Sequence, residues 1–157
     1  MAILLSSPAF SEGSEIPARH TCDGPNLSPP LHWHGVPEGA RTLALIVEDP
    51  DAPSGTFVHW VLFDLPATVT ELAEGIPTTE TLPSGARQGR NDFRRVGYAG
   101  PCPPRGSAHR YFFKIYALDG EVSLRPGATG PDLLRAAQGH VLAESQLMGR
   151  YKRRVAA

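Results

Sequence analysis

The sequence predicts a mainly β protein with a sandwich architecture, and three observations support this prediction. Short segments of β character recur along the chain, and turn signals rich in Pro, Gly, Asn and Asp separate them. Glycine and proline number 16 each, yet hydrophobic residues still make up 41% of the chain, so the protein is loop-rich but not disordered. A length of 157 residues suits one domain. We therefore expect a single domain over residues 1–157.

The predicted strands alternate with long connections. In chain order, the strands cover residues 2–5, 31–33, 42–48, 57–63 and 110–118. Two connections stand out because they are long and rich in proline and glycine, namely residues 21–30 and 97–106. Loops of this length often carry function.

Helical periodicity occurs only near the C-terminus. Thr129 is a candidate cap that precedes an early proline, and Gly149 is a natural stop. Between them, one stripe is formed by Leu134, Ala137, Val141, Ser145 and Met148. We therefore expect one or two peripheral helices packed on the sheet, followed by a solvated basic tail at residues 150–154.

Charge and cysteine usage narrow the class of protein. The formal net charge is −1, so no broad field attracts nucleic acid or an anionic membrane. The N-terminus lacks a signal-sequence pattern, and no apolar run is long enough to span a bilayer. We expect a cytoplasmic protein without stable membrane insertion. Cys22 and Cys102 could pair only in an oxidising compartment or as a redox device, and no CxxC motif is present, so we expect two free thiols.

Polar residues open two of the apolar strands. His59 lies near the start of one, and His109 and Tyr111 open another. Because side chains alternate with period two, we expect His59 to share a face with Val61 and Phe63. Likewise, His109 and Tyr111 should begin a core-facing row. A few polar groups above an apolar floor predict a pocket at the rim of the β-core.

Asp49 adds a carboxylate at the end of the strand that precedes His59. Pro50 stops the ladder there, so Asp49 lies on the turn, where a carboxylate bonded to an imidazole N–H can fix the ring tautomer. In one interpretation, the histidines are simply satisfied core residues. In a second, two histidines and a carboxylate bind a metal, although only His32 and His34 have a close ligand spacing and they lie on an ordinary strand end.

A third interpretation is an anion pocket. In it, partly protonated imidazoles, the Tyr111 hydroxyl and backbone N–H groups of residues 97–106 converge on a phosphate or carboxylate. No P-loop motif is present, and no serine lies in a nucleophile-elbow context. Nothing in the residues themselves therefore indicates an enzyme.

Several ordered motifs make almost the whole chain resemble the phosphatidylethanolamine-binding protein family, in its bacterial and archaeal branch described as Raf kinase inhibitor-like. These motifs are TCDG at 21–24, SPPL at 28–31, DPDAP at 49–53, VHWV at 58–61, QGRNDF at 88–93, GYAGPCPP at 97–104, HRYF at 109–112 and GHVLA at 139–143. The resemblance implies an antiparallel β-sandwich with peripheral helices and a small anion pocket. Its ligand-binding positions fall on Asp49, His59, His109 and Tyr111, with Pro53 and Pro101 on the wall. One departure is Ser107, which replaces the family's usual glycine two residues before His109.

The leading hypothesis is a soluble binding protein for phosphate or another small anionic or phosphorylated group. A kinase or other protein of phospho-signalling is a further expected partner, and a homodimer is an assembly that the resemblance suggests. No cofactor, metal or nucleic acid is expected. The alternative function is a metal-assisted or acid–base hydrolase that acts on a small phosphoester or ester with the same pocket residues.

Overall fold

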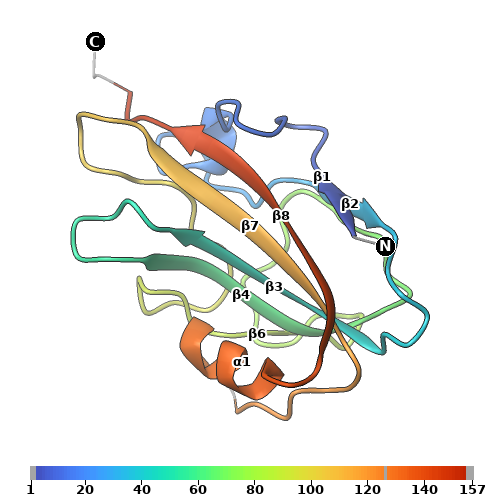
Figure 1. Ribbon diagram of the computed structural model, residues 1–157. Coiled ribbons are helices and arrows are strands. Elements are labelled where there is room, and N and C mark those ends of the chain that lie inside the picture. The colour runs from blue at the N-terminus through green and yellow to red at the C-terminus, as the bar shows by residue number, and fades with distance from the viewer. Residues whose placement is uncertain (1–2, 126, 155–157) are drawn as a thin grey trace.

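The computed structural model describes residues 3–125 and 127–154, and strands dominate it (Figure 1). The strands are β1 (Leu4–Ser6), β2 (Leu31–His34), β3 (Thr42–Asp49), β4 (Phe57–Pro66), β5 (Glu71–Leu72), β6 (Arg87–Gln88), β7 (His109–Leu118) and β8 (Val141–Tyr151). One α-helix, α1 (Gly130–Ala137), precedes β8, and one turn of 3-10 helix covers Ala18–His20.

The strands form two antiparallel sheets, which confirms the predicted sandwich. The larger sheet has the order β6-β4-β3-β7-β8, and the smaller one has the order β1-β2-β5. The main core combines buried side chains of both sheets, such as Trp33 and Leu72 from the smaller sheet and Leu45, Trp60 and Phe113 from the larger. Burial of these large apolar side chains is the main force that holds the sheets together.

Helix α1 covers part of the opposite face of the larger sheet (Figure 1). Leu133 and Ala137 pack there with Val58, Val61 and Phe63 of β4 in a second apolar cluster. The helix begins at a complete capping box, in which the Thr129 side chain accepts from the Asp132 N–H and the Asp132 side chain accepts from the Thr129 N–H. The predicted cap at Thr129 is therefore confirmed.

The C-terminal prediction was wrong beyond α1. Residues 141–148, expected to continue the helical stripe, belong to β8, which pairs with β7 from Val141 to Tyr151. The helix ends at Ala137 because Gly139 takes a positive φ of 84° and turns the chain back. As a strand, the segment satisfies the backbone groups of β7, which would otherwise form an open sheet edge.

The two ends of the chain also differ from the sequence prediction. The first strand covers Leu4–Ser6, and Ala2, where we expected it to begin, lies outside the described residues. The basic tail is not simply solvated, because Tyr151 is buried and its hydroxyl bonds to the Asp23 carboxylate. Arg153 bonds to the same carboxylate at 3.1 Å, so the tail is fastened to the loop that follows the 3-10 turn.

A break in strand register decides which way His59 faces. Between β3 and β4, Val47 pairs with Trp60, but the next residue, Glu48, pairs with Val58, so His59 is an extra residue on β4. A bulge of this kind reverses the alternation of side chains on one side of the insertion. The prediction that His59 shares a face with Val61 was therefore wrong, because Val61 lies on the face that α1 covers and His59 does not. Its ring lies 5.3 Å from that of Tyr111, on the face toward the smaller sheet.

Candidate functional site

A small cavity of about 170 Å³ lies where the end of β3 meets the beginnings of β4 and β7. This is the end of the larger sheet at which the arrowhead of β3 lies in Figure 1. Antiparallel pairing brings these three strand ends together, although their residues are far apart in sequence. Five residues predicted from the sequence line the cavity: Asp49, Pro53, His59, His109 and Tyr111. The structure thus brings both imidazoles and the carboxylate into one pocket.

His109 is oriented by Asp49. The His109 Nδ1 atom lies 2.6 Å from Asp49 Oδ2, and the Asp49 side chain is almost fully buried. The other oxygen, Asp49 Oδ1, accepts the backbone N–H of Asp51 at 2.7 Å, which holds the carboxylate in place. Since a carboxylate accepts, the His109 proton belongs on Nδ1, and Nε2 is the nitrogen left for a ligand.

His59 is oriented by the backbone instead of by a carboxylate. Its Nδ1 donates to the Ala99 carbonyl oxygen at 2.6 Å. We expected Asp49 to bond to a histidine. Its partner is His109 of β7, which is 60 residues away in the sequence, and not His59, which is closer in the sequence. Burial lowers the pKa of His59 below its usual value, against a smaller opposing effect of the Ala99 carbonyl. The ring is therefore neutral near pH 7, with a lone pair on Nε2.

Tyr111 supplies a buried hydroxyl that has no hydrogen-bond partner among the described residues. The residue is only 1% exposed, and its ring packs between His59 and His109. Burial raises the pKa of Tyr111 well above the usual value, and the nearby Asp49 carboxylate, whose contact with the hydroxyl falls short of hydrogen-bond geometry, adds to the rise. The hydroxyl thus stays protonated and can donate. Buried polar groups without a partner are rare in folded proteins and need an explanation.

Two details of the predicted pocket differ from expectation. Pro101 is not among the residues that line the cavity; it is buried, and its carbonyl accepts the Cys22 N–H at 3.1 Å. The expected backbone donors of the 97–106 loop are also partly used: the Ala99 N–H bonds to the His59 carbonyl and the Gly100 N–H to Asn26 Oδ1. An anion would consequently be held mainly by side chains.

Sequence reasoning missed most of the apolar lining. The additional lining residues are Ala52, Phe57, Phe93, Cys102, Pro103 and Pro104. Phe93 is 42% exposed and packs edge-on against both Phe57 and His59, with ring centroids 4.7 and 5.5 Å apart. The signal was present, since Phe57 opens the His59 strand and Phe93 ends one of the motifs, but period-two reasoning cannot show which loops cover a pocket.

The structure joins Cys22 and Cys102 in a disulfide, which contradicts the expected free thiols. Their Cα atoms are 5.3 Å apart despite a sequence separation of 80. The two long loops that contain them pack against each other, as the bond from the Gly100 N–H to Asn26 shows. Cysteine spacing could not reveal this proximity, because the fold and not the local sequence creates it.

No group of three or more potential metal ligands occurs among the described residues. The His32 and His34 side chains are exposed on β2, on the side away from the core. Within the same described ranges, no helix has both the length and the apolar character needed to cross a membrane.

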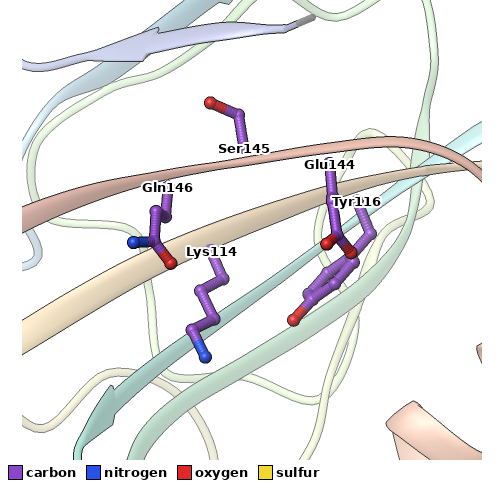
Figure 2. A pocket seen from close by; sticks show the side chains of 5 residues that line it. All are labelled: Lys114, Tyr116, Glu144, Ser145 and Gln146. Atoms are coloured by element: carbon purple, nitrogen blue, oxygen red, sulfur yellow. The ribbon is translucent and has the colours of Figure 1, made fainter.

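A second hollow, of about 260 Å³, lies on the outer face of β7 and β8 (Figure 2). Its lining residues are Lys114, Tyr116, Glu144, Ser145 and Gln146. Figure 2 shows the Ser145 side chain on the opposite side of the strand from the others. The Lys114 ammonium already pairs with Glu48, and burial, aided by Glu48 and Glu144, raises the pKa of Tyr116 to about 12. Its one cation is thus neutralised, and the site favours an anion less than the His59 pocket does.

Fold and pocket together define a β-sandwich protein with a small, mostly apolar cavity at the rim of its larger sheet. A sequence model described as phosphatidylethanolamine-binding protein matches residues 6–152. The chain therefore belongs to the phosphatidylethanolamine-binding protein family.

Relatives and solved structures agree with this assignment. The chain is 53% identical over 149 residues to a UPF0098 protein of Methanothermobacter thermautotrophicus, covering 95% of this chain and 98% of the relative. It matches the crystal structure of CT736 from Chlamydia trachomatis, described as a putative phosphatidylethanolamine-binding protein homolog, with a TM-score of 0.89, 42% identity and coverage of 98% and 99% of the two chains. YbcL of E. coli, described as a new member of the mammalian family, matches with a TM-score of 0.91, 34% identity and coverage of 98% and 100%.

Proposed function

We propose that the protein binds a small phosphorylated or similarly anionic group in the pocket of Asp49, His59, His109 and Tyr111. The observation that carries this proposal is the buried Tyr111 hydroxyl, which has no partner among the described residues and belongs to a ring that packs against both imidazoles. A ligand oxygen would satisfy it. Since leaving a buried donor unpaired costs about 1–3 kcal/mol, a ligand that accepts this hydrogen bond gains affinity from it.

The tautomers of the two histidines specify the protonation state of the complex. Both Nδ1 atoms face protein acceptors, so Nε2 is the atom that each ring can offer to a ligand. Burial keeps the His59 ring neutral, so a fully deprotonated phosphate would meet the lone pair of its Nε2. A phosphate monoanion instead donates its own P–OH to this nitrogen, and a dianion needs the His59 ring to take up a proton. Both routes place one added proton in the complex.

The walls indicate what the anion is attached to. Phe57, Phe93, Pro53, Pro103 and Pro104 surround the polar groups with apolar surface. A cavity of about 170 Å³ is too small for a drug-sized ligand, so we propose that the phosphoryl group enters and that an apolar substituent rests on Phe93 at the rim. A phosphorylated side chain of a protein partner and a phosphorylated metabolite both meet this description.

Calorimetric titration with phenyl phosphate and with inorganic phosphate tests the proposal. Phenyl phosphate should bind more tightly, and affinity for both should weaken as pH rises from 6 to 8, because the added proton becomes harder to retain. Titrations in two buffers of different ionisation enthalpy should report uptake of up to one proton per ligand. Undetectable binding of both compounds at pH 6, or binding with an unchanged affinity in Tyr111→Phe, would remove the basis of the proposal.

The Asp49–His109 pair favours one alternative, an acid–base hydrolase, because a carboxylate-oriented imidazole can act as a general base. Among the lining residues, however, no serine, threonine or free thiol offers a nucleophile, since Cys102 is in the disulfide. Such an enzyme would have to activate water. A panel of phosphoesters and carboxylic esters separates the two functions, because turnover that disappears in His109→Gln would indicate hydrolysis, whereas simple binding leaves every compound intact.

A further inference from the structure

One wall of the pocket belongs to a segment that few non-covalent bonds hold in place. The preceding residues are anchored by hydrogen bonds from the Ala99 N–H to His59 and from the Cys22 N–H to Pro101. From 102 to 108, no backbone group forms a backbone hydrogen bond with any described residue. Two prolines in this stretch have no N–H at all. Pairing of β7 with its neighbours resumes at His109.

The disulfide fastens this segment at its start. Cys102 lines the pocket directly, and its bond to Cys22 ties the wall to the loop that follows the 3-10 turn. Cys102 also accepts a long hydrogen bond from Arg153, whose Nη1 atom lies 3.5 Å from Cys102 Sγ, and this contact is weak. Both cysteines are partly exposed, so a reductant can reach the bond.

We propose that the Cys22–Cys102 disulfide is a redox control of ligand binding: the oxidised form holds the pocket wall closed, and reduction releases residues 102–108 and weakens binding. This inference rests on the proposed function of the pocket. Few backbone bonds oppose the release, so opening should be local and leave both sheets intact. Ligand binding would then have to order the loop, and this entropy cost lowers the affinity.

The chemistry is ordinary thiol–disulfide exchange with a dithiol reductant of the thioredoxin class. One thiolate of the reductant attacks Cys22 Sγ, forms a mixed disulfide, and releases Cys102 as a thiolate beside the Arg153 guanidinium, which stabilises the negative charge. The second thiol of the reductant then attacks the mixed disulfide and frees Cys22. The protein gains two electrons and two protons, and the dithiol becomes a disulfide.

Phenyl phosphate titration of three samples tests the binding effect: oxidised protein, protein reduced with dithiothreitol, and Cys22→Ser. The last variant breaks the bridge but leaves Cys102, the cysteine that lines the pocket, in place. We expect the dissociation constant to rise about tenfold on reduction because the wall is no longer preorganised. Cys22→Ser should match the reduced protein and show no response to dithiothreitol. Equal affinity in the oxidised and reduced samples, with thiol labelling confirming reduction, would overturn the proposal.

Limited trypsin digestion tests the release of the loop without any ligand. Arg105 is an exposed residue in the segment, and Arg135, exposed on α1, is the matched control site in the folded protein. Reduction should speed cleavage after Arg105 about tenfold relative to cleavage after Arg135, because only the loop opens locally. Equal acceleration at both sites would mean global unfolding and would overturn the local mechanism. If phosphate bound in neither state, the proposed function would be wrong, and the Arg105 rate alone would decide whether the disulfide controls the wall.

Discussion

Tyr111 combines two properties that rarely occur together, deep burial and a hydroxyl that finds no partner in the described part of the chain. A residue selected only for packing would be served equally well by phenylalanine, which fills the same volume without a polar atom to desolvate. Packing of its ring against His59 and His109 gives the hydroxyl a different use, as a donor that stays protonated near neutral pH because burial raises its pKa.

Tyr111→Phe should therefore separate stability from binding. Without ligand, the free energy of unfolding should stay equal or rise by up to about 1 kcal/mol, since an unsatisfied polar atom is removed. Affinity for phenyl phosphate should fall by about tenfold or more, the loss of a hydrogen bond to a charged group worth roughly 1.5–3 kcal/mol. Urea unfolding and calorimetric titration measure the two effects.

Tyr98→Phe is the matched control for this substitution. Tyr98 is also buried, but its hydroxyl donates to the His20 carbonyl at 2.6 Å. Its removal leaves that carbonyl unpaired, so we expect a loss of about 1–3 kcal/mol of stability. Affinity per folded molecule should change little. A Tyr111→Phe protein that behaved like Tyr98→Phe, less stable and unchanged in binding, would show that the Tyr111 hydroxyl is structural.

At the scale of elements, the bulge in β4 and the long strand β8 build the site. The bulge turns His59 toward Tyr111. Strand β8 pairs with β7 along its outer edge in the same sheet, and in this register Gly149 lies opposite Tyr111. A Cβ atom at Gly149 would lie 2.5 Å from Ile16 Cγ1 and 2.8 Å from Phe10 Cε2. The buried side chains of Ile16 and Phe10 thus lie so close to β8 at Gly149 that a residue with a side chain would not fit without a shift.

Gly149→Ala should destabilise the protein by about 1–3 kcal/mol, because overpacking forces buried neighbours out of place. Gly120→Ala is the matched control, since a Cβ there meets nothing within 4 Å, and its effect should stay within about 0.5 kcal/mol. Urea midpoints of the two variants and the parent decide the point. Equal midpoints for Gly149→Ala and Gly120→Ala would contradict the packing described for β8.

At the scale of the whole molecule, two buried histidines link stability to pH. Burial lowers the pKa of both His20 and His59 below 6.5, outweighing the effects that raise them. As pH falls below 6.5, the unfolded chain takes up these protons before the folded protein does, so stability is fully present above pH 6.5 and is lost below it. Asp51 is not involved, because hydrogen bonding to Arg110 lowers its pKa to about 2.

The urea midpoint should accordingly decrease as the pH is lowered from 7 to 5. The free energy of unfolding should decrease by at most about 1.4 kcal/mol per pH unit for each histidine. Phenyl phosphate should reduce the fall, because the proposed complex holds one added proton in the folded state. A midpoint that stayed constant or rose over this range would contradict neutral burial of the two rings.

Much of the site could be predicted from the chain because period-two alternation is a local property. It correctly placed Tyr111 on the same face as Phe113. Pro50 correctly marked the end of the strand, but Asp49 is the last paired residue of β3, opposite Phe57, and does not lie on the turn as predicted. The same rule failed for His59, since register depends on the neighbouring strand and one extra residue reverses the face. Residues 141–148 failed for a related reason: their apolar spacing fits a helix, but the open edge of β7 made strand pairing more favourable.

The class of fold, the family and the set of polar groups follow from local features of the chain, because alternation, turn residues and ordered motifs each lie within short stretches of sequence. Long-range packing establishes that Asp49 orients His109, that Ala99 orients His59, and that Cys22 reaches Cys102. Each of these contacts joins residues 40 or more positions apart. Packing of the two sheets and their loops brings such residues together, and no short stretch of sequence shows that they are close in space.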